Sequence, residues 1–237
     1  MQKRTLKELI DAIDSAWPLV QEWVTKARNN VEVLPANRGR GEEVLLHLQI
    51  TTRSPLGSVA LETGGILIDH GWLRFLGSGN EQMQGNLLFW NAKGEILKDQ
   101  PLTGAFIVAH DVLGGFFALN GGAFPGALGS TFYFAPDRLK WESTKLSYSQ
   151  LLQWALNGDL DLFYKGMRWS GWKDEVSRMS CDQGFSIIPF LWTGPEPPIA
   201  ERSRRAVPMT ELWGLQQGLA RQIGDARPGT PIKIHFT

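Results

Sequence analysis

The sequence predicts an α+β fold in which an antiparallel β-meander sheet is flanked by N-terminal and C-terminal helices. Amphipathic patterns with helix caps occupy both ends of the chain, and short β-branched or aromatic runs separated by glycine pairs fill residues 64–141. Glycine turns favour an antiparallel meander, because a parallel βαβ unit needs a crossover of roughly a dozen residues. A chain of 237 residues suits one domain.

Two helices are expected before the sheet. Thr5, followed three residues later by Glu8, forms a capping-box pattern, and apolar residues then recur at helical spacing over residues 5–14. Pro18 suits the first turn of a second helix that begins near Trp17 and ends at Asn29-Asn30.

The next segment is ambiguous. Residues 31–34 are short and apolar, and residues 35–41 are typical of an exposed basic loop. Residues 42–52 alternate as in a strand, although Leu45 and Leu48 behind acidic residues also suit a helix; we expect the strand. Ser54-Pro55 then predicts a capped helix through about Glu62.

The glycine- and aromatic-rich tract predicts the sheet. Expected strands are residues 66–69 and 72–76 around a turn at His70-Gly71, and then residues 105–109, 116–119 and 131–134. Residues 80–91 suit either a helix or an irregular cover segment, and a turn at Pro136-Asp137 is expected to leave the sheet.

The chain changes character after the sheet. Ser147 with Gln150 is a second capping box, so a helix is expected to end at Asn157-Gly158. Residues 1–157 are therefore expected to form a core, and residues 158–237 a C-terminal helical extension packed on the same domain. In that extension we expect helices at 160–167, 171–179 and 208–222, a strand at 185–192 and a basic loop at 201–205.

Composition narrows the function classes. Lysine plus arginine equal aspartate plus glutamate at 24 each, so no net field favours nucleic acid or acidic membranes. The charged, amphipathic start does not resemble a signal peptide, and no apolar run approaches the ~20 residues that span a bilayer. Cys181 is the single cysteine, which rules out an internal disulfide and fits the cytoplasm.

Motifs for chemistry are weak. The sequence has no paired ligand spacing among its four histidines, no nucleophile elbow and no phosphate loop, so neither a metal nor a cofactor is expected. One alternative remains open, a small-molecule-binding or hydrolytic pocket made by Asp69, His70, His110 and Asp111. Adjacent residues on a strand point to opposite faces, so only one of each pair can reach a common point.

Four runs carry a family resemblance: TGGILIDHGWLRFLGSG at 63–79, FIVAHDVLGGFFALNGG at 106–122, YFAPDRLKWE at 133–142 and FYKGMRW at 163–169. They resemble an uncharacterised bacterial family defined only as a domain of unknown function. More distantly, the order of elements over residues 5–157 is similar to the SUKH superfamily, through Gly64-Gly65, residues 109–116 and the 147–157 helix. About 80 further residues have no SUKH counterpart.

The SUKH resemblance implies a sheet-centred binding fold, and many members are immunity proteins that neutralise toxins. We therefore expect a non-enzymatic, cytoplasmic protein-binding domain that occludes a partner such as a toxin, with no nucleic-acid or membrane partner. Trp and Arg dominate interface hot spots, so the expected partner contacts are Trp72, Arg74, Trp90, Arg168, Trp169 and Trp172. Core packing is the competing role for each of them, and we expect at least half to be buried.

Overall fold

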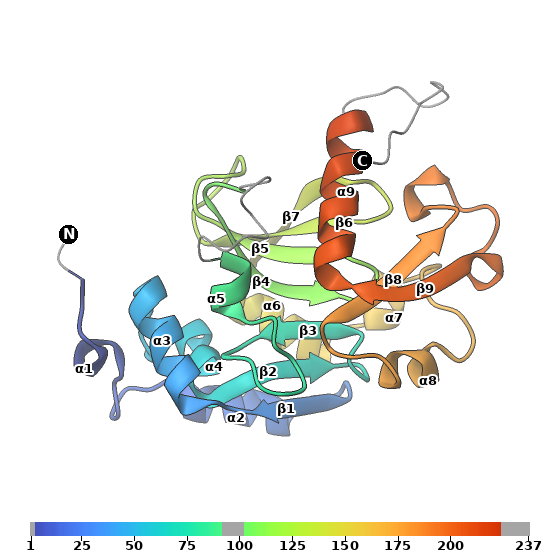
Figure 1. Ribbon diagram of the computed structural model, residues 1–237. Coiled ribbons are helices and arrows are strands. Elements are labelled where there is room, and N and C mark those ends of the chain that lie inside the picture. Colours follow the sequence, from blue (N-terminus) through green and yellow to red (C-terminus); the bar gives the residue numbers. More distant parts are fainter. Residues whose placement is uncertain (1–2, 92–101, 224–237) are drawn as a thin grey trace.

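A seven-stranded antiparallel meander forms the centre of the protein, as the sequence predicts (Figure 1). The computed structural model describes residues 3–91 and 102–223. Each strand pairs with the next one along the chain. The strands are β1 (Val31–Pro35), β2 (Thr63–Ile68), β3 (Leu73–Leu76), β4 (Ala105–Asp111), β5 (Phe116–Asn120), β6 (Ser130–Ala135) and β7 (Lys140–Ser147).

The two edge strands extend the predicted sheet. Residues 31–34 carry too short a pattern to be assigned, and the sheet was expected to end at the 136–137 turn, whereas β1 and β7 continue the meander on either side. β7 carries little apolar alternation, because its residues are half-buried at most. An edge strand that faces water on several sides lacks the period-two signal on which strand prediction depends.

Helices precede and interrupt the sheet. They are α1 (Leu6–Leu9), α2 (Trp17–Thr25), α3 (Arg38–Leu48), α4 (Pro55–Glu62), α5 (Leu87–Asn91), α6 (Tyr148–Asn157), α7 (Leu160–Phe163), α8 (Trp172–Ser177) and α9 (Met209–Ile223), with 3₁₀ turns η2 (Leu191–Thr193) and η3 (Ile199–Glu201). The capping boxes predicted at Thr5 and Ser147 are both present. The first helix is shorter than residues 5–14.

The strand expected at residues 42–52 is wrong, because α3 occupies most of that segment. The Asn37 side chain caps α3 by accepting a hydrogen bond from the Arg40 backbone N–H at 3.1 Å. Val44 and Leu45 turn toward the core, and Gly41 lets α3 approach α4 closely, since a Cβ there would meet the Ala60 carbonyl at 3.0 Å. Apolar alternation over a few residues cannot tell these two structures apart.

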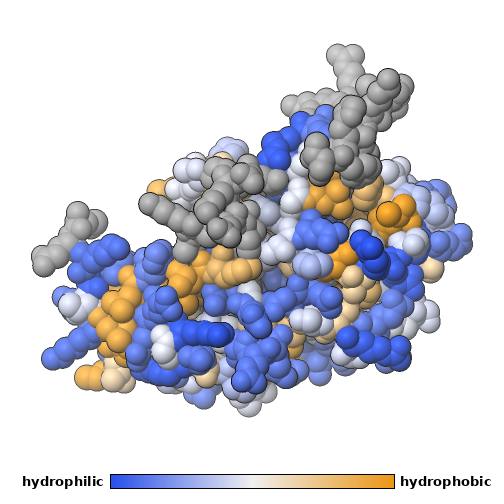
Figure 2. All heavy atoms as spheres, in the orientation of Figure 1, coloured by the Kyte–Doolittle hydropathy of each residue, from blue (hydrophilic) through white to orange (hydrophobic). Residues whose placement is uncertain are grey.

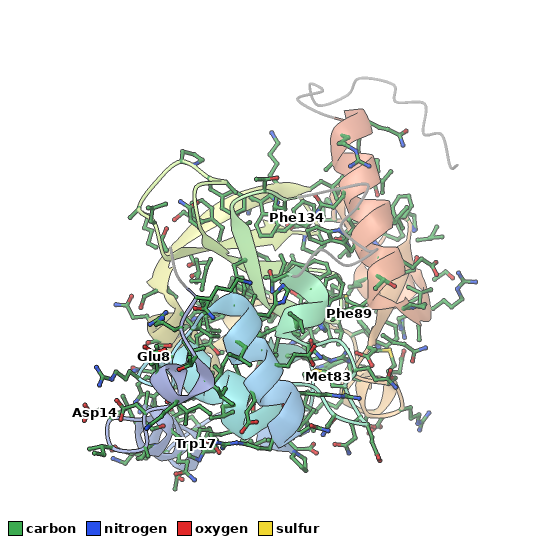
Figure 3. The ribbon with its side chains drawn as sticks, turned by 60° about the vertical axis from the view of Figure 1, so that its left-hand side comes forward. Glu8, Asp14, Trp17, Met83, Phe89 and Phe134 are labelled. Atoms are coloured by element: carbon green, nitrogen blue, oxygen red, sulfur yellow. The ribbon has the colours of Figure 1, made fainter. Side chains whose placement is uncertain are left out.

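Helices cover both faces of the sheet, and the two faces contain different side chains. α5 and α9 lie on the face toward the viewer in Figure 1, and α6 and α7 lie behind it. Phe116 and Phe134 point toward α9, and Figure 3 labels Phe134 on β6 and Phe89 on α5. Phe117 and Tyr133 point to the opposite face, toward α6 and α7. We call these the α5/α9 face and the α6/α7 face.

The C-terminal extension contributes to the same core. Trp213 of α9 is 1% exposed and packs on Phe116 of the sheet. The strand expected at residues 185–192 corresponds to β8 (Gln183–Ile188), which pairs antiparallel with β9 (Ser203–Pro208), a strand that was not expected in the extension. β9 takes up most of the expected basic loop at 201–205. On β9 the Arg204 side chain is half-buried, Arg205 is exposed and Val207 is buried. A mostly exposed, basic strand has too little apolar alternation to be told from a loop in the sequence.

Candidate functional site

The residues expected to contact a partner are mostly in the core. Trp72, Arg74, Trp90, Trp169 and Trp172 are all buried, with exposed fractions from 0 to 9%. The Arg168 side chain is 11% exposed. These five side chains are closed to a partner in this structure, so the contacts expected of them are corrected. The four tryptophans serve packing, and Arg74 donates hydrogen bonds to three backbone carbonyls.

Arg168 organises one of these aromatic groups. Its guanidinium lies 4.5 Å from the Trp172 ring, 4.9 Å from the Trp72 ring and 5.2 Å from the Tyr164 ring. It also pairs with the carboxylates of Asp69 and Asp161. Cation–π contacts and ion pairs hold the segment after α7 against the β2–β3 turn, which explains why Trp and Arg cluster here without an exposed interface.

The four residues of the alternative Asp/His pocket do not meet. Asp69 is committed to Arg168, and His70 is exposed at the β2–β3 turn, with its ring edge-on to Trp172 at 6.1 Å. His110 and Asp111 lie next to each other on β4 and point to opposite faces of the sheet. The alternation that the sequence implied therefore separates the candidates.

His110 lies on the α5/α9 face among apolar groups. Its ring packs on Trp90 and Phe116 at 6.1 and 5.9 Å, and Arg74 is its cross-strand neighbour. Burial and the positive charge of Arg74 hold the pKa of His110 well below its ordinary value of 6.5. The imidazole is therefore neutral near pH 7, and its buried Nδ1 has no hydrogen-bond partner among the described residues.

Asp111 has the opposite environment on the α6/α7 face. Its carboxylate accepts hydrogen bonds from the hydroxyls of Tyr133 at 2.7 Å and Tyr164 at 3.2 Å. The backbone N–H groups of Leu113 and Gly115 donate to it at 2.9 Å each. Burial raises the pKa of Asp111, and the four hydrogen bonds oppose that rise. These bonds fix the β4–β5 turn and link it to β6 and α7.

Gly115 is required for this network. A Cβ at this position would collide with the Asp111 carboxylate and with the Tyr133 hydroxyl. The preceding Gly114 has a φ of +79°, which L side chains rarely adopt. The glycine pair thus serves the hairpin turn, as predicted, and also leaves room for the buried hydrogen bonds.

Above this network the α6/α7 face opens into an aromatic groove. We define the groove by Phe117, Tyr133, Trp154 and Phe163, which line a cavity of about 260 Å³. Ring centroids lie 4.5 Å apart for Phe117 and Tyr133, 5.3 Å for Tyr133 and Phe163, and 4.9 Å for Trp154 and Phe163. Phe163 is 39% exposed, and its neighbour Leu162 is 66% exposed.

The rim of the aromatic groove is polar and lies on the edge strand β7. Glu142, Ser143 and Thr144 line this side. The pairing of β7 with β6 is irregular between Ser143 and Ser147, and Lys145 has a φ of +61°. A bulge and lysines on an edge strand discourage the addition of another strand, so the groove offers side-chain pockets and not a pairing edge.

The opposite side of the molecule presents a different surface. Figure 2 shows a largely hydrophilic face with hydrophobic side chains gathered beside α3 and α9. Leu46 of α3 is 41% exposed and Phe89 of α5 is 42% exposed. These residues come from separate elements, and among the described residues the Phe89 ring contacts the Trp90 ring alone, at 5.6 Å. Phe163 of the groove contacts the rings of Phe117, Tyr133, Trp154 and Tyr164.

The four groove residues carry no common signal in the sequence. Trp154 and Phe163 were assigned to helices, and Phe117 and Tyr133 to strands, without a common role. The available signal was the pair Phe116-Phe117, since consecutive aromatics on a strand face opposite sides. That signal predicts aromatic contacts on both faces, but it does not say which face stays open.

Metal and membrane features can be stated for residues 3–91 and 102–223. Within these ranges no three His, Cys, Asp or Glu residues are placed to hold a metal ion. No helix in the same ranges combines the length and the apolar character needed to cross a bilayer.

Comparison with known proteins identifies the family. The model of the DUF2625 family, described as a protein of unknown function, matches residues 6–212. The chain therefore belongs to this family, and the resemblance to an uncharacterised bacterial family is confirmed. The more distant likeness to the SUKH superfamily stays a prediction.

Two relatives cover nearly the whole chain. The chain is 42% identical over 213 residues to the putative uncharacterized protein YbfG of Escherichia coli K12, covering 90% of this chain and 95% of that protein. It is 37% identical over 204 residues to an uncharacterized protein of Haemophilus influenzae, covering 86% and 90%. No solved structure matches the chain.

Proposed function

We propose that the protein is a non-enzymatic protein-binding module whose partner inserts apolar side chains into the aromatic groove. The observation that carries this proposal is a cavity of about 260 Å³ with four aromatic rings, one of them in a residue that is 39% exposed. Aromatic side chains supply large contact area at low conformational cost and are enriched at the centre of interfaces.

The rigidity of the aromatic groove supports a binding role. Tyr133 is held from below by Asp111, and Asp111 is held by the β4–β5 turn. A surface that is ordered before association loses less entropy when a partner binds. Asp111 is thus a positioning residue, and its proposed task is to orient the floor of the groove.

The proposed mechanism is steric occlusion, in which the bound partner loses access to its own substrate or target. The SUKH resemblance supports a toxin as the class of partner. A cytoplasmic site of action is part of the proposal, because a chain with one cysteine suits a reducing compartment. The enzyme alternative gains no support from the separated positions of Asp69, His70, His110 and Asp111.

A matched pair of phenylalanine variants tests the proposal. Phe163→Ala removes a ring of the aromatic groove that is 39% exposed, and Phe89→Ala makes the same change at a 42% exposed position of α5. Tagged full-length proteins are incubated with extract of the native host, and bound proteins are compared. We expect a protein that wild type and Phe89→Ala retain and that Phe163→Ala loses.

The proposal fails if no protein is recovered, or if Phe163→Ala and Phe89→Ala recover the same proteins at the same level. Circular dichroism of each variant checks that the fold is intact. The toxin assignment has its own test: expression of the recovered partner without this chain should stop growth, and co-expression of wild type, but not Phe163→Ala, should restore it.

A further inference from the structure

A second hollow lies next to the aromatic groove and has a different chemistry. It has a volume of about 610 Å³ and is lined by the β6–β7 turn, the segment after α7 and the η2–η3 region. We call it the basic pocket, because Arg138, Lys165, Arg168 and Arg202 line it against one carboxylate, Asp137. Volumes of roughly 300–1,000 Å³ are typical of small-molecule sites.

The charge of Arg202 is the central feature of the basic pocket. Arg202 is 4% exposed, and its described hydrogen bonds all go to backbone carbonyls. The acceptors are Pro197 at 2.8 Å, Phe190 at 2.8 Å, Pro189 at 3.1 Å and Gly194. Carbonyl dipoles satisfy the N–H donors but leave the positive charge of Arg202 in place. Within the described chain no carboxylate pairs with this buried guanidinium, which lines the cavity.

The other cations differ in how far they are neutralised. Arg138 pairs with Glu142 at 2.7 Å, and Arg168 pairs with two aspartates. Lys165 is exposed and forms no ion pair within the described ranges. Lys165 and Arg202 therefore leave a positive field in the basic pocket that favours an anion.

Two buried donors at the basic pocket have no acceptor within residues 3–91 and 102–223. They are the Nε of Arg168 and the Nε1 of Trp192, and both residues line the cavity. Buried donors without partners cost free energy. A ligand with several acceptor oxygens supplies what these side chains lack.

The remaining wall is apolar. Leu191, Trp192, Met167, Ile199 and Pro198 line it, and the Trp192 ring stacks on Phe190 with a centroid distance of 5.8 Å and an interplanar angle of 15°. This apolar wall can accept a flat organic ring, and the basic side chains can bind an anionic group attached to that ring.

We propose that the basic pocket binds an organic phosphate, with its phosphoryl oxygens toward Lys165 and Arg202 and its organic body against Trp192. A phosphate ester near pH 7 carries a charge between about −1.5 and −2 and three acceptor oxygens. A monocarboxylate offers one charge and two oxygens. The excess of cations in the lining therefore favours the phosphate.

Isothermal titration calorimetry of the full chain tests this with three probes: adenosine monophosphate, inorganic phosphate and the aromatic monocarboxylate benzoate. We expect adenosine monophosphate to bind more tightly than either inorganic phosphate or benzoate. Binding of benzoate as tightly as adenosine monophosphate, or no binding of adenosine monophosphate, overturns the proposal.

Two charge-reversal variants give a matched comparison. Lys165→Glu changes the charge in the basic pocket, and Lys7→Glu makes the same change at an exposed position of α1. We expect Lys165→Glu to weaken binding of adenosine monophosphate by about tenfold or more. Lys7→Glu should leave it unchanged, and equal weakening by both variants contradicts a local site.

Trp192→Ala tests the organic half of the ligand. It should weaken adenosine monophosphate while leaving the affinity for inorganic phosphate unchanged, and the retained phosphate binding shows that the pocket is still folded. If Trp192→Ala weakens neither adenosine monophosphate nor phosphate, Trp192 is not part of the binding site. The groove variant Phe163→Ala should bind adenosine monophosphate as wild type does, so failure of the proposed protein-binding function and failure of this site are separate results.

Discussion

The neighbouring residues His110 and Asp111 lie on opposite faces of the central sheet in opposite environments. On the α5/α9 face, the Nδ1 of His110 is buried without a partner among the described residues, as are the Nε1 atoms of Trp90 and Trp213. On the α6/α7 face, Asp111 accepts four hydrogen bonds, although the Tyr148 hydroxyl there has no partner in the described chain. His110 is therefore held by the shape and area of the rings around it, and Asp111 by a defined polar network.

This difference bears on function. Ring packing tolerates some variation in orientation, whereas hydrogen bonds to a carboxylate fix direction as well as distance. The network occurs beneath the aromatic groove, where Tyr133 must be held while part of its surroundings stays open. A rigid floor under an exposed groove is consistent with the proposed binding role.

The largest expected effect breaks the packing of the α5/α9 face. Trp213→Ala should lower the free energy of unfolding by about 3–5 kcal/mol, because Trp213 is 1% exposed and the change leaves a cavity beside Phe116. Trp154→Ala should cost roughly half as much, since Trp154 is only partly buried and its site is open to water. Urea denaturation of both variants measures the difference. Equal costs would mean that the groove face is packed as tightly as the other.

The next effect isolates the polar network. Tyr133→Phe should lower the free energy of unfolding by about 1.5–3 kcal/mol, because it removes a hydrogen bond to a buried carboxylate. Tyr148→Phe is the matched control on the same face. The Tyr148 hydroxyl is buried without a partner in the described part of the chain, so its loss should be neutral or slightly stabilising.

Both tyrosine variants can be measured by thermal and urea unfolding. If Tyr148→Phe costs as much as Tyr133→Phe, the stability of this face depends on hydroxyl burial in general. The hydrogen bond from Tyr133 to Asp111 would then no longer explain the geometry of the groove. If Tyr133→Phe alone destabilises, the network is the specific element of the α6/α7 face.

The sequence was most informative where local chemistry decides the structure. The caps at Thr5, Ser54 and Ser147 and the glycine turns of the meander depend on neighbouring residues, and the structure confirms them. α3 could not be decided locally, since its apolar residues suit both structures. Contact with α4 through Gly41 selects the helix, and that contact is invisible in the sequence.

The candidate site was less predictable than the fold. Alternation along β4 correctly separated His110 from Asp111, but it did not say which face would close under α5 and α9 and which would stay partly open. The aromatic groove needs β5, β6, β7, α6 and α7 together. The expected partner contacts were chosen by residue type, and type does not distinguish an interface from a core in which five of the ten tryptophans are buried.

The smallest expected effect is a pH dependence confined to the α5/α9 face. The pKa of His110 is lowered well below 6.5 in the folded state. Its neutral form therefore contributes stability above about pH 6.5, and this contribution is lost as the pH falls toward the lowered folded-state pKa. The free energy of unfolding should fall by up to about 1.4 kcal/mol per pH unit from this group alone.

His110→Leu keeps an apolar side chain against Trp90 and Phe116 and should remove that part of the slope. The same substitution at the exposed His47 is the control, because that ring remains in water whether the chain is folded or not. Urea unfolding at several pH values below 6.5 measures the slopes. If His110→Leu and His47→Leu both keep the wild-type slope, the neutral histidine is not what makes this face sensitive to acid, and the contrast between the two faces would have to rest on packing and hydrogen bonds alone.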